Sequence, residues 1–354
     1  MAALWLSLFV SIASLMLGID EADLLFVGDA MQHQAQLDAA RTSGGYDYSQ
    51  SFADITPLVT MADYAVVNLE TPVGPPPHSG YPCFNAPEAF VDALKDAGFD
   101  LMLTANNHTL DRGHRGLRST VGVLDSRGLD HTGTYACDSA RAASVPLLTE
   151  INGFKVSFLN YTYGTNGISP RDGVVVDYID RERMKADVQA ARAAGAEIVA
   201  MCIHWGDEYR LLPNNSQRLL ADFVEALGVD MLIGGHPHVI QPMEFRPNRY
   251  YPEKQFVLVY SLGNFISNMK TPDTRGGAMV HVGLGRGSDG RAKLTRAEYR
   301  LLFTVPGSRP SDNFRVLEAD SVPAGPWRGR AEDFMRRARA VFDRHNVGVA
   351  EVRP

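Results

Sequence analysis

The sequence has few cysteines, and their spacing suits neither a thiolate metal site nor a disulfide framework. Only three occur in 354 residues, Cys83, Cys137 and Cys202, and no pair has the C-x-x-C spacing. Cys202 lies inside an apolar run, which leaves a single Cys83–Cys137 bridge as the open alternative. We therefore expect a hydrophobic core, rather than cross-links, to stabilise the fold.

The chain also lacks an excess of positive charge. Its 34 lysines and arginines stand against 41 aspartates and glutamates, which gives a formal net charge of -7. Such a balance provides no field for holding nucleic acid or an anionic membrane, so nucleic acid is not an expected partner. With 45% hydrophobic residues, the chain is long enough to bury one large core or two ordinary ones.

A long apolar run stands at the N-terminus, but it is short for a membrane span. It contains about seventeen mostly apolar residues, whereas a helix needs about 20 to cross a bilayer. Its length is typical of a signal-peptide core, although a positive flank and a clear cleavage site are missing. Residues 1–20 are therefore predicted to be a signal peptide or an anchor, unless the start codon is misplaced. Either segment implies a protein of the cell envelope that is exported or faces outside.

One structural unit recurs along the chain: an amphipathic helix, a glycine, an apolar strand and a cluster of polar residues. The three copies cover residues 87–108, 181–206 and 215–238. Pro87 suits the first turn of the first helix, and Gly98 suits its end. Asp180 is predicted to cap the second helix, which ends at Gly195.

The third copy has the plainest helical pattern. Asn215 is predicted to cap this helix and Gly228 to end it. The spacing of its apolar residues predicts a buried stripe, made of Leu219, Leu220, Phe223 and Leu227.

Polar residues stand where the predicted strands end. Two further apolar runs finish in the same way, the first at Asp29 and the second at Asn68 and Glu70. Short aliphatic strands that alternate with helices indicate mainly parallel sheets buried on both faces. Because ligands bind at the carboxyl ends of such strands, we expect one shared edge to carry Asp29, Glu70, Asn107, His108, His204, His236 and His238.

This convergence bears on the His236-Pro237-His238 motif. Taken alone, the motif is more typical of a turn than of a ligand pair. Several strand ends that each supply a donor favour a metal centre instead. Carboxylate, amide and imidazole donors suit zinc, manganese or iron(II), and the lack of thiolates argues against a structural zinc. The sequence therefore predicts one or two divalent ions.

Six motifs give the chain a resemblance to a known family. In order they are FVGDAMQHQ, VVNLETPVG, TANNHTLDRGHRGL, IHWGDEY, GGHPHVIQPMEF and VYSLGNF, from about Leu24 to about Leu284. They resemble the CapA family of capsule or poly-gamma-glutamate synthesis proteins, which have a metallophosphatase-like domain. The resemblance implies an α/β fold of four layers, αββα, related to calcineurin-like phosphoesterases. The pattern of elements alone favours a single doubly wound sheet.

The resemblance also implies a domain division and roles for individual residues. Residues 21–300 would form the metallophosphatase-like domain, and residues 301–354 a C-terminal extension packed on it. The implied acid or anion stabiliser is His108. Asp111 either orients His108 or caps the helix that follows. The implied metal ligands are Asp29, Glu70, Asn107, His204, His236 and His238.

Two positions depart from the family pattern. Met31 stands where phosphoesterases have a histidine, and His33 is the alternative donor from the next turn. Glu70 stands near the place of a metal-bridging aspartate, so either its longer arm reaches the ion or Asn68 contributes an amide oxygen.

Two functions remain open from the sequence. The first is a metal-dependent hydrolase that cleaves a phosphoester or a gamma-glutamyl amide bond. The second is a non-catalytic envelope scaffold that binds poly-gamma-glutamate or another anionic polymer in a membrane synthesis or export complex. Met31 and Glu70 favour the scaffold, whereas Asn107, His108 and the three later histidines favour the enzyme.

Overall fold

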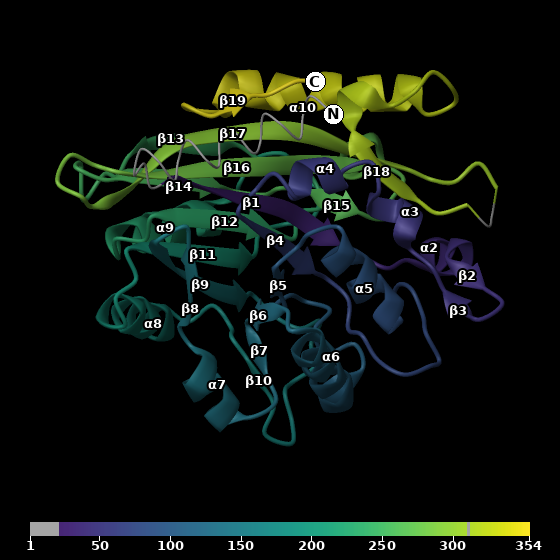
Figure 1. The fold of residues 1–354 in the computed structure, drawn as a ribbon, viewed down its shortest axis with the longest axis horizontal. Helices are drawn as coiled ribbons and strands as arrows, with labels where there is room; N and C mark the ends of the chain where they lie inside the picture. The colour runs from purple at the N-terminus through teal and green to yellow at the C-terminus, as the bar shows by residue number, and fades with distance from the viewer. Residues whose placement is uncertain (1–20, 310–311) are drawn as a thin grey trace.

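The computed structural model describes residues 21–309 and 312–354, and two large β-sheets dominate it (Figure 1). The signal peptide or anchor predicted for residues 1–20 lies outside the described residues. Within the described ranges, no helix is both long enough and apolar enough to span a bilayer. Cys83 and Cys137 are free, exposed thiols, and Cys202 is buried, so the alternative of a Cys83–Cys137 bridge is wrong.

The larger sheet has parallel strands at one side and antiparallel strands at the other. Its order is β18-β17-β16-β1-β4-β5-β6, with β15 paired to β1 and β19 to β17. The strands parallel to β1 (Glu21–Ala30) are β4 (Tyr64–Leu69), β5 (Leu101–Leu103), β6 (Asp130–Thr132) and β15 (Asn264–Ile266). The remaining strands are β16 (Gly276–Arg286), β17 (Ala292–Val305), β18 (Arg315–Glu318) and β19 (Ala350–Glu351).

The smaller sheet repeats this arrangement with a parallel centre. Its order is β13-β14-β12-β11-β9-β8, and only the two outer strands run antiparallel to their neighbours. The strands are β8 (Leu147–Ile151), β9 (Phe154–Thr162), β11 (Ile198–His204), β12 (Met231–Gly235), β13 (Met243–Pro247) and β14 (Gln255–Val259). Two short ribbons pair β2 (Arg41–Thr42) with β3 (Gly45–Tyr46) and β7 (Thr134–Tyr135) with β10 (Val175–Val176).

The two sheets face each other, and helices cover their outer faces. The largest apolar cluster joins both sheets, as in the 6.5 Å contact between the rings of Phe26 and Phe158. One outer face is covered by α3 (Ser49–Phe52), α4 (Thr56–Val59), α5 (Glu88–Asp96) and α6 (Gly113–Arg127). The other is covered by α8 (Arg181–Ala193) and α9 (Asn215–Ala226). The four-layer αββα fold is confirmed, and the single doubly wound sheet is wrong.

The observed helix ends agree with the predicted ones in two copies of the repeated unit. In the third copy the cap residue differs from the predicted one by a single position. Helix α5 begins after Pro87, and Asp180 caps α8 by accepting a 2.8 Å hydrogen bond from the Arg183 N–H. Helix α9 is capped by Asn214, not by the predicted Asn215. Asn214 forms a reciprocal capping box with Gln217, which the next residue cannot form at that spacing.

The buried stripe of α9 is also rotated from the predicted one. Leu220 is 8% exposed, but Leu219 is 65% exposed and faces away from the sheet. Successive helical residues are about 100° apart, so both leucines cannot face the same layer. The buried face instead combines Leu220 with Gln217, Ala221 and Val224.

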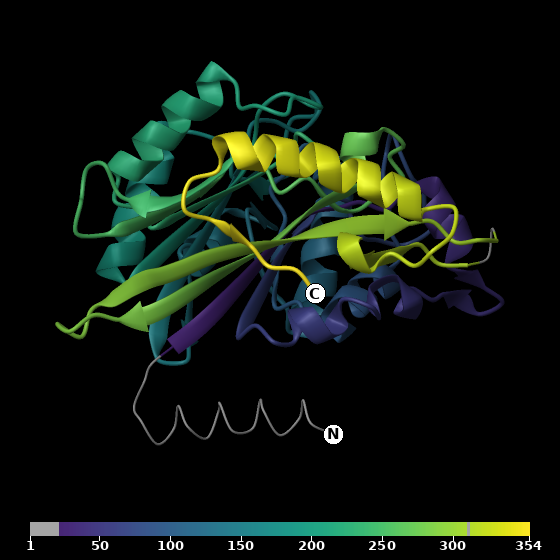
Figure 2. The ribbon, with the colours of Figure 1, turned by 90° about the horizontal axis from the view of Figure 1, so that it is seen from above.

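The C-terminal segment packs onto the larger sheet as a long helix. Helix α10 (Arg328–His345) lies along the β16–β17 hairpin (Figure 2). Phe334 and Phe342 contact Phe303 and Tyr299 of β17. The expected boundary at residue 301 falls inside β17, and a division there stays a prediction. The other short elements are α2 (Gln34–Ala39), α7 (Asp138–Ser144), and the 3-10 turns η1 (Pro272–Thr274) and η2 (Ala319–Ser321).

The rotated face of α9 can be tested with neighbouring substitutions. We expect Leu220→Ala to lower the free energy of unfolding by about 2–5 kcal/mol because it opens a cavity under the helix. Leu219→Ala, which trims an exposed side chain, should change it by less than about 0.5 kcal/mol. Urea unfolding followed by circular dichroism measures both. Equal losses for the two variants would contradict the observed face.

Candidate metal centre

The polar residues at the strand ends meet between the two sheets. Asp29 lies at the end of β1, Glu70 directly follows β4, and Asn107 lies in the loop after β5. From the facing sheet, His204 ends β11 and His236 directly follows β12. All five are buried, as is His238. The parallel strands of both sheets therefore deliver their donors to one place.

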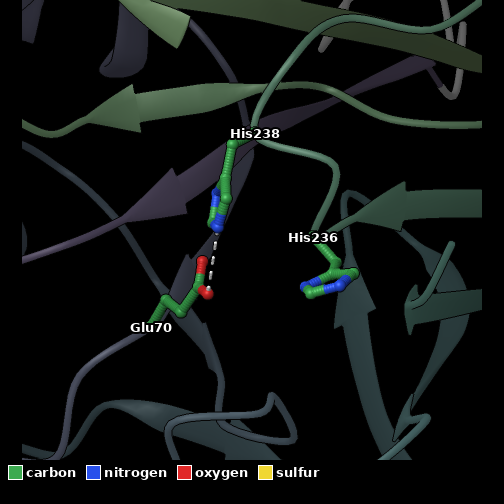
Figure 3. A group of neighbouring side chains, drawn as sticks. All are labelled: Glu70, His236 and His238. Carbon is green, nitrogen blue, oxygen red and sulfur yellow. Dashed lines mark ion pairs between the residues drawn. The ribbon is translucent and has the colours of Figure 1, made fainter. Parts of the chain in front are cut away.

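Glu70 is common to two groups of side chains that could each hold a metal ion. One group is Glu70, His236 and His238 (Figure 3), and the other is Asp29, Glu70 and His204. In each group, one donor atom from every residue lies within 4.8 Å of the others. The longer side chain of Glu70 therefore brings its carboxylate within reach of the donors of both groups.

The buried donors fit a cation because the protein leaves several of them unsatisfied. Neither carboxylate oxygen of Glu70 has a hydrogen-bond partner, and neither does Nδ1 of His236. A buried carboxylate without a donor costs several kcal/mol. A divalent cation is the kind of group that offsets this cost. The chemistry of these donors therefore fits one or two such ions.

Asp29 is held rigidly against the glycine that precedes the histidine pair. Its Oδ1 accepts a 2.8 Å hydrogen bond from Asn68 Nδ2, and its Oδ2 accepts a 3.2 Å hydrogen bond from the His236 backbone N–H. A side chain at Gly235 would place a Cβ 2.8 Å from Asp29 Oδ1. The amide group of Asn68 thus donates to the carboxylate, with its oxygen turned toward Asn106.

Two amide side chains contact the histidine rings. His238 Nδ1 lies 3.0 Å from Asn264 Oδ1, so its Nε2 is left facing Glu70 at 3.9 Å. His204 Nε2 lies 2.8 Å from Asn107 Oδ1 and 3.5 Å from Glu70 Oε1. The Asn264 amide thus fixes the direction of the His238 ring, as partners of metal-binding histidines do, whereas Asn107 Oδ1 and His204 Nε2 meet as two candidate donors.

The backbone of the His-Pro-His motif is held in an uncommon conformation. His236 has φ 97° and His238 has φ 57°, so both lie in the left-handed region. Residues other than glycine seldom occupy this region, and each instance costs of order 1–3 kcal/mol. An ordinary turn does not need two such residues. The strain directs both rings toward Glu70.

Burial and neighbouring charges set unequal protonation states in the cluster. Burial lowers the pKa of His204 to about 3 and that of His236 to about 2, so both rings are neutral. Burial and the charge of Asp29 raise the pKa of Glu70 to about 8. Burial lowers the pKa of His238, but the charges of Glu70 and Asp29 outweigh it and raise the value to about 9. Asp29 stays ionised, because His238 and His204 outweigh burial and lower its pKa to about 2.

His108 stands beside the cluster and is oriented by Asp111. Its Nδ1 lies 2.8 Å from Asp111 Oδ2, which also accepts a 2.8 Å hydrogen bond from the Phe84 N–H. The Phe84 ring packs edge-on against the imidazole. Helix α6 begins at Gly113 with Arg112 as its cap residue, so Asp111 contacts the histidine and does not cap the helix.

Of the two positions that depart from the family pattern, Glu70 belongs to both donor groups, whereas Met31 and its alternative donor His33 lie outside them. Met31 is buried, and its backbone bonds to Ile266 and Gln36. His33 caps α2, and its Nδ1 accepts a hydrogen bond from the Asn268 N–H. Neither residue belongs to a donor group, so His33 does not replace the missing histidine in this structure.

Some residues around the centre had no recognisable signal in the sequence. Asn160 of β9 accepts a 2.7 Å hydrogen bond from the Ala105 N–H and so joins the two sheets below the site. Asn166 accepts from Asn107 Nδ2, and the Tyr163 ring lies 4.6 Å from His236. Tyr163 and Asn166 both belong to the loop that follows β9, which therefore lies beside the centre.

Comparisons with known proteins first define the class. The solved structure of Haemophilus influenzae NAD nucleotidase (NadN) superposes with a TM-score of 0.51, covering 94% of this chain and 57% of that chain. At 12% identity this likeness concerns the fold alone. The protein therefore has an αββα sandwich fold like that of this nucleotidase, with candidate metal ligands between its sheets.

The family follows from sequence comparisons. The family described as "Bacterial capsule synthesis protein PGA_cap" matches residues 23–269, and the chain belongs to it. The "PGA biosynthesis protein CapA" of Bacillus subtilis (strain 168) is 28% identical over 324 residues, covering 87% of this chain and 80% of that protein. The "Capsule biosynthesis protein CapA" of Bacillus anthracis is 27% identical over 278 residues, covering 75% of this chain and 64% of that protein. The CapA resemblance is confirmed.

Removing the histidine pair should remove the metal. We expect His236→Ala/His238→Ala to retain less manganese or zinc than the wild type after dialysis, because one of the two donor groups keeps only Glu70. Plasma mass spectrometry of the purified proteins measures the content. His345→Ala, which changes an exposed histidine on α10, should keep the wild-type content. Unchanged metal in the double variant would place the ion elsewhere.

The affinity for the metal should rise with pH. Glu70 and His238 hold protons below about pH 8 and 9, respectively, and a cation must displace them. Below about pH 8 we expect affinity to fall roughly tenfold per pH unit for each displaced proton. Titration with Mn²⁺ at several pH values measures this slope. A flat profile would show that the two groups do not ligate the ion.

Proposed function

We propose that this protein is a metal-dependent hydrolase of capsule or poly-gamma-glutamate synthesis. The bond that it cleaves would be a phosphoester or a gamma-glutamyl amide. The observation that carries the proposal is the oriented His108 beside a buried, unsatisfied donor set. We propose Asp29, Glu70, Asn107, His204, His236 and His238 as the metal ligands.

The residues divide the chemical work between them. A bound divalent ion would supply a hydroxide at neutral pH and polarise the scissile bond. Asp111 fixes the His108 ring through Nδ1, which leaves Nε2 for the leaving group. Burial lowers the pKa of His108, but the hydrogen bond to Asp111 and the charge of Glu70 raise it overall. The raised pKa increases the protonated fraction of His108, which favours a role as general acid.

Exposed aromatic side chains surround the centre on the solvent side. The rings of Tyr81, Tyr163 and Tyr209 lie 6.4 Å from His108, 4.6 Å from His236 and 6.3 Å from His238. All three are exposed although they border buried groups. They form the surface that a substrate would contact first.

The scaffold alternative is not favoured, because the donor set and the oriented acid are both present. Names of the relatives associate them with capsule and PGA synthesis, and on this basis we infer an anionic polymer as substrate or partner. We infer a site of action in the cell envelope, with a membrane synthesis or export complex as the setting.

Loss of the proposed acid should separate catalysis from metal binding. We expect His108→Ala to lower kcat about 10²- to 10⁴-fold and to retain its metal, because the ring lies outside both donor groups. Assays on bis(p-nitrophenyl) phosphate and on gamma-glutamyl oligomers, with metal analysis in parallel, test this. Asp111→Asn should shift the acidic limb of the pH profile. Wild-type turnover by His108→Ala, or no turnover on either substrate class by the wild type, would contradict the proposal.

A further inference from the structure

A buried arginine without an acidic partner lies at the start of α10. Arg275, directly after η1, is only 7% exposed. Within residues 21–309 and 312–354, its guanidinium donates no hydrogen bond and forms no ion pair, and its Nε is fully enclosed. Buried arginines are almost always paired, since an unpaired charge in the interior costs several kcal/mol. An anion from outside these residues would compensate this charge.

A second arginine, Arg330, contacts the same tryptophan ring as Arg275. The guanidinium carbons of Arg275 and Arg330 lie 4.8 and 4.9 Å from the centre of the Trp327 ring. Burial and the Arg330 charge both lower the pKa of Arg275, so the two cations repel each other. Trp327 is partly buried and offsets some of this repulsion through its ring face, but it carries no negative charge.

Nearby acidic residues are already engaged by other arginines. Asp273 pairs with Arg337, and Asp320 pairs with Arg339. Glu332 pairs with Arg328. Arg275 and Arg330 are thus left as an uncompensated pair among carboxylates that have their own partners.

The backbone adds a further positive field. Trp327 is the cap residue of α10, an 18-residue helix whose first turn has no acidic residue and no side-chain cap. Helix N-termini carry about half a positive charge, although the N–H groups of Arg328, Arg330 and Ala331 already bond to the carbonyls of Gly325 and Trp327, so the field acts mainly through the helix dipole. Both guanidinium groups lie against the ring of the residue that caps this helix end.

We propose that Arg275, Arg330 and the N-terminus of α10 form a binding site for one oxyanion, a carboxylate or a phosphate group. This site is separate from the metal centre and does not depend on the proposed function. One residue connects the two sites. The Oδ1 of Asn264 contacts His238, and its Nδ2 donates to the carbonyl of Thr274, which precedes Arg275. The source of the oxyanion is either free phosphate or a carboxylate of an acidic chain.

Thermal unfolding of the full-length, metal-loaded protein tests this site. Phosphate, glutarate and poly-gamma-glutamate are the probes, each compared with sodium chloride at equal ionic strength. We expect at least one probe to raise the Tm of the wild type. Arg275→Met should lose the shift, and its Tm without a probe should stay close to that of the wild type, because the repulsion from Arg330 is removed together with the contact to Trp327. Arg336→Met, which removes an exposed arginine from the same helix, is the matched control and should keep the shift.

Fluorescence gives an independent readout if Arg275→Met folds poorly. Trp327 should report titration with the active probe, and Trp327→Phe should lose that signal. The exposed Arg330→Met should weaken binding about tenfold. A response to phosphate alone identifies free phosphate as the source, and a response to glutarate and the polymer identifies a carboxylate chain.

The proposed metal ligands are unchanged in these variants. If the proposed hydrolase function is wrong, the Tm shifts of the wild type and of the variants are therefore affected equally. Only the difference between Arg275→Met and Arg336→Met reports this site. Absence of any probe-dependent shift in the wild type, or equal shifts in both variants, would overturn the proposal.

Discussion

The carboxylate of Glu70 imposes the constraint around which the centre is built. It is fully buried, and neither oxygen accepts a hydrogen bond from the protein. Proteins seldom retain such a group unless a proton or a cation compensates it. The neighbours are arranged for the second case: neutral His204 and His236 present lone pairs, and Asp29 adds a second negative charge. The strained backbone at His236 and His238 is explained in the same way, because it turns two rings toward this carboxylate.

The fold places these groups together by pairing two sheets with parallel centres. Donors from the first sheet and from the second meet because the strands of each end at the same side of the sandwich. Directly below, Asn160 joins the two sheets by accepting from the Ala105 N–H, and it donates to the Cys202 carbonyl of its own sheet. Small shifts between the sheets would change the distances across the whole centre, which gives the inter-sheet hydrogen bond to Ala105 a role in positioning the ligands.

The sequence predicted the strand-end donors well, since a polar cluster after a buried parallel strand has few structural uses. It could not show that there are two sheets. Leu24 and Leu25 are both fully buried, one in the core between the sheets and the other beneath the helices, so the run carries no alternation. Only the CapA resemblance supplied the two-sheet sandwich.

Leu219 was wrongly assigned to the buried face of α9, because two adjacent leucines fit two helical faces equally well. Phe84 and Arg275 act through contacts with segments distant in sequence, which local patterns do not encode.

The central claim is that Glu70 bridges two donor groups and holds a cation between the sheets. Anomalous X-ray diffraction from crystals grown with Mn²⁺ tests it most directly. We expect one or two manganese peaks in contact with the Glu70 carboxylate, one against His236 and His238 and the other against Asp29 and His204. A structure in which manganese binds elsewhere, or in which Glu70 has no metal contact at saturating Mn²⁺, would contradict it.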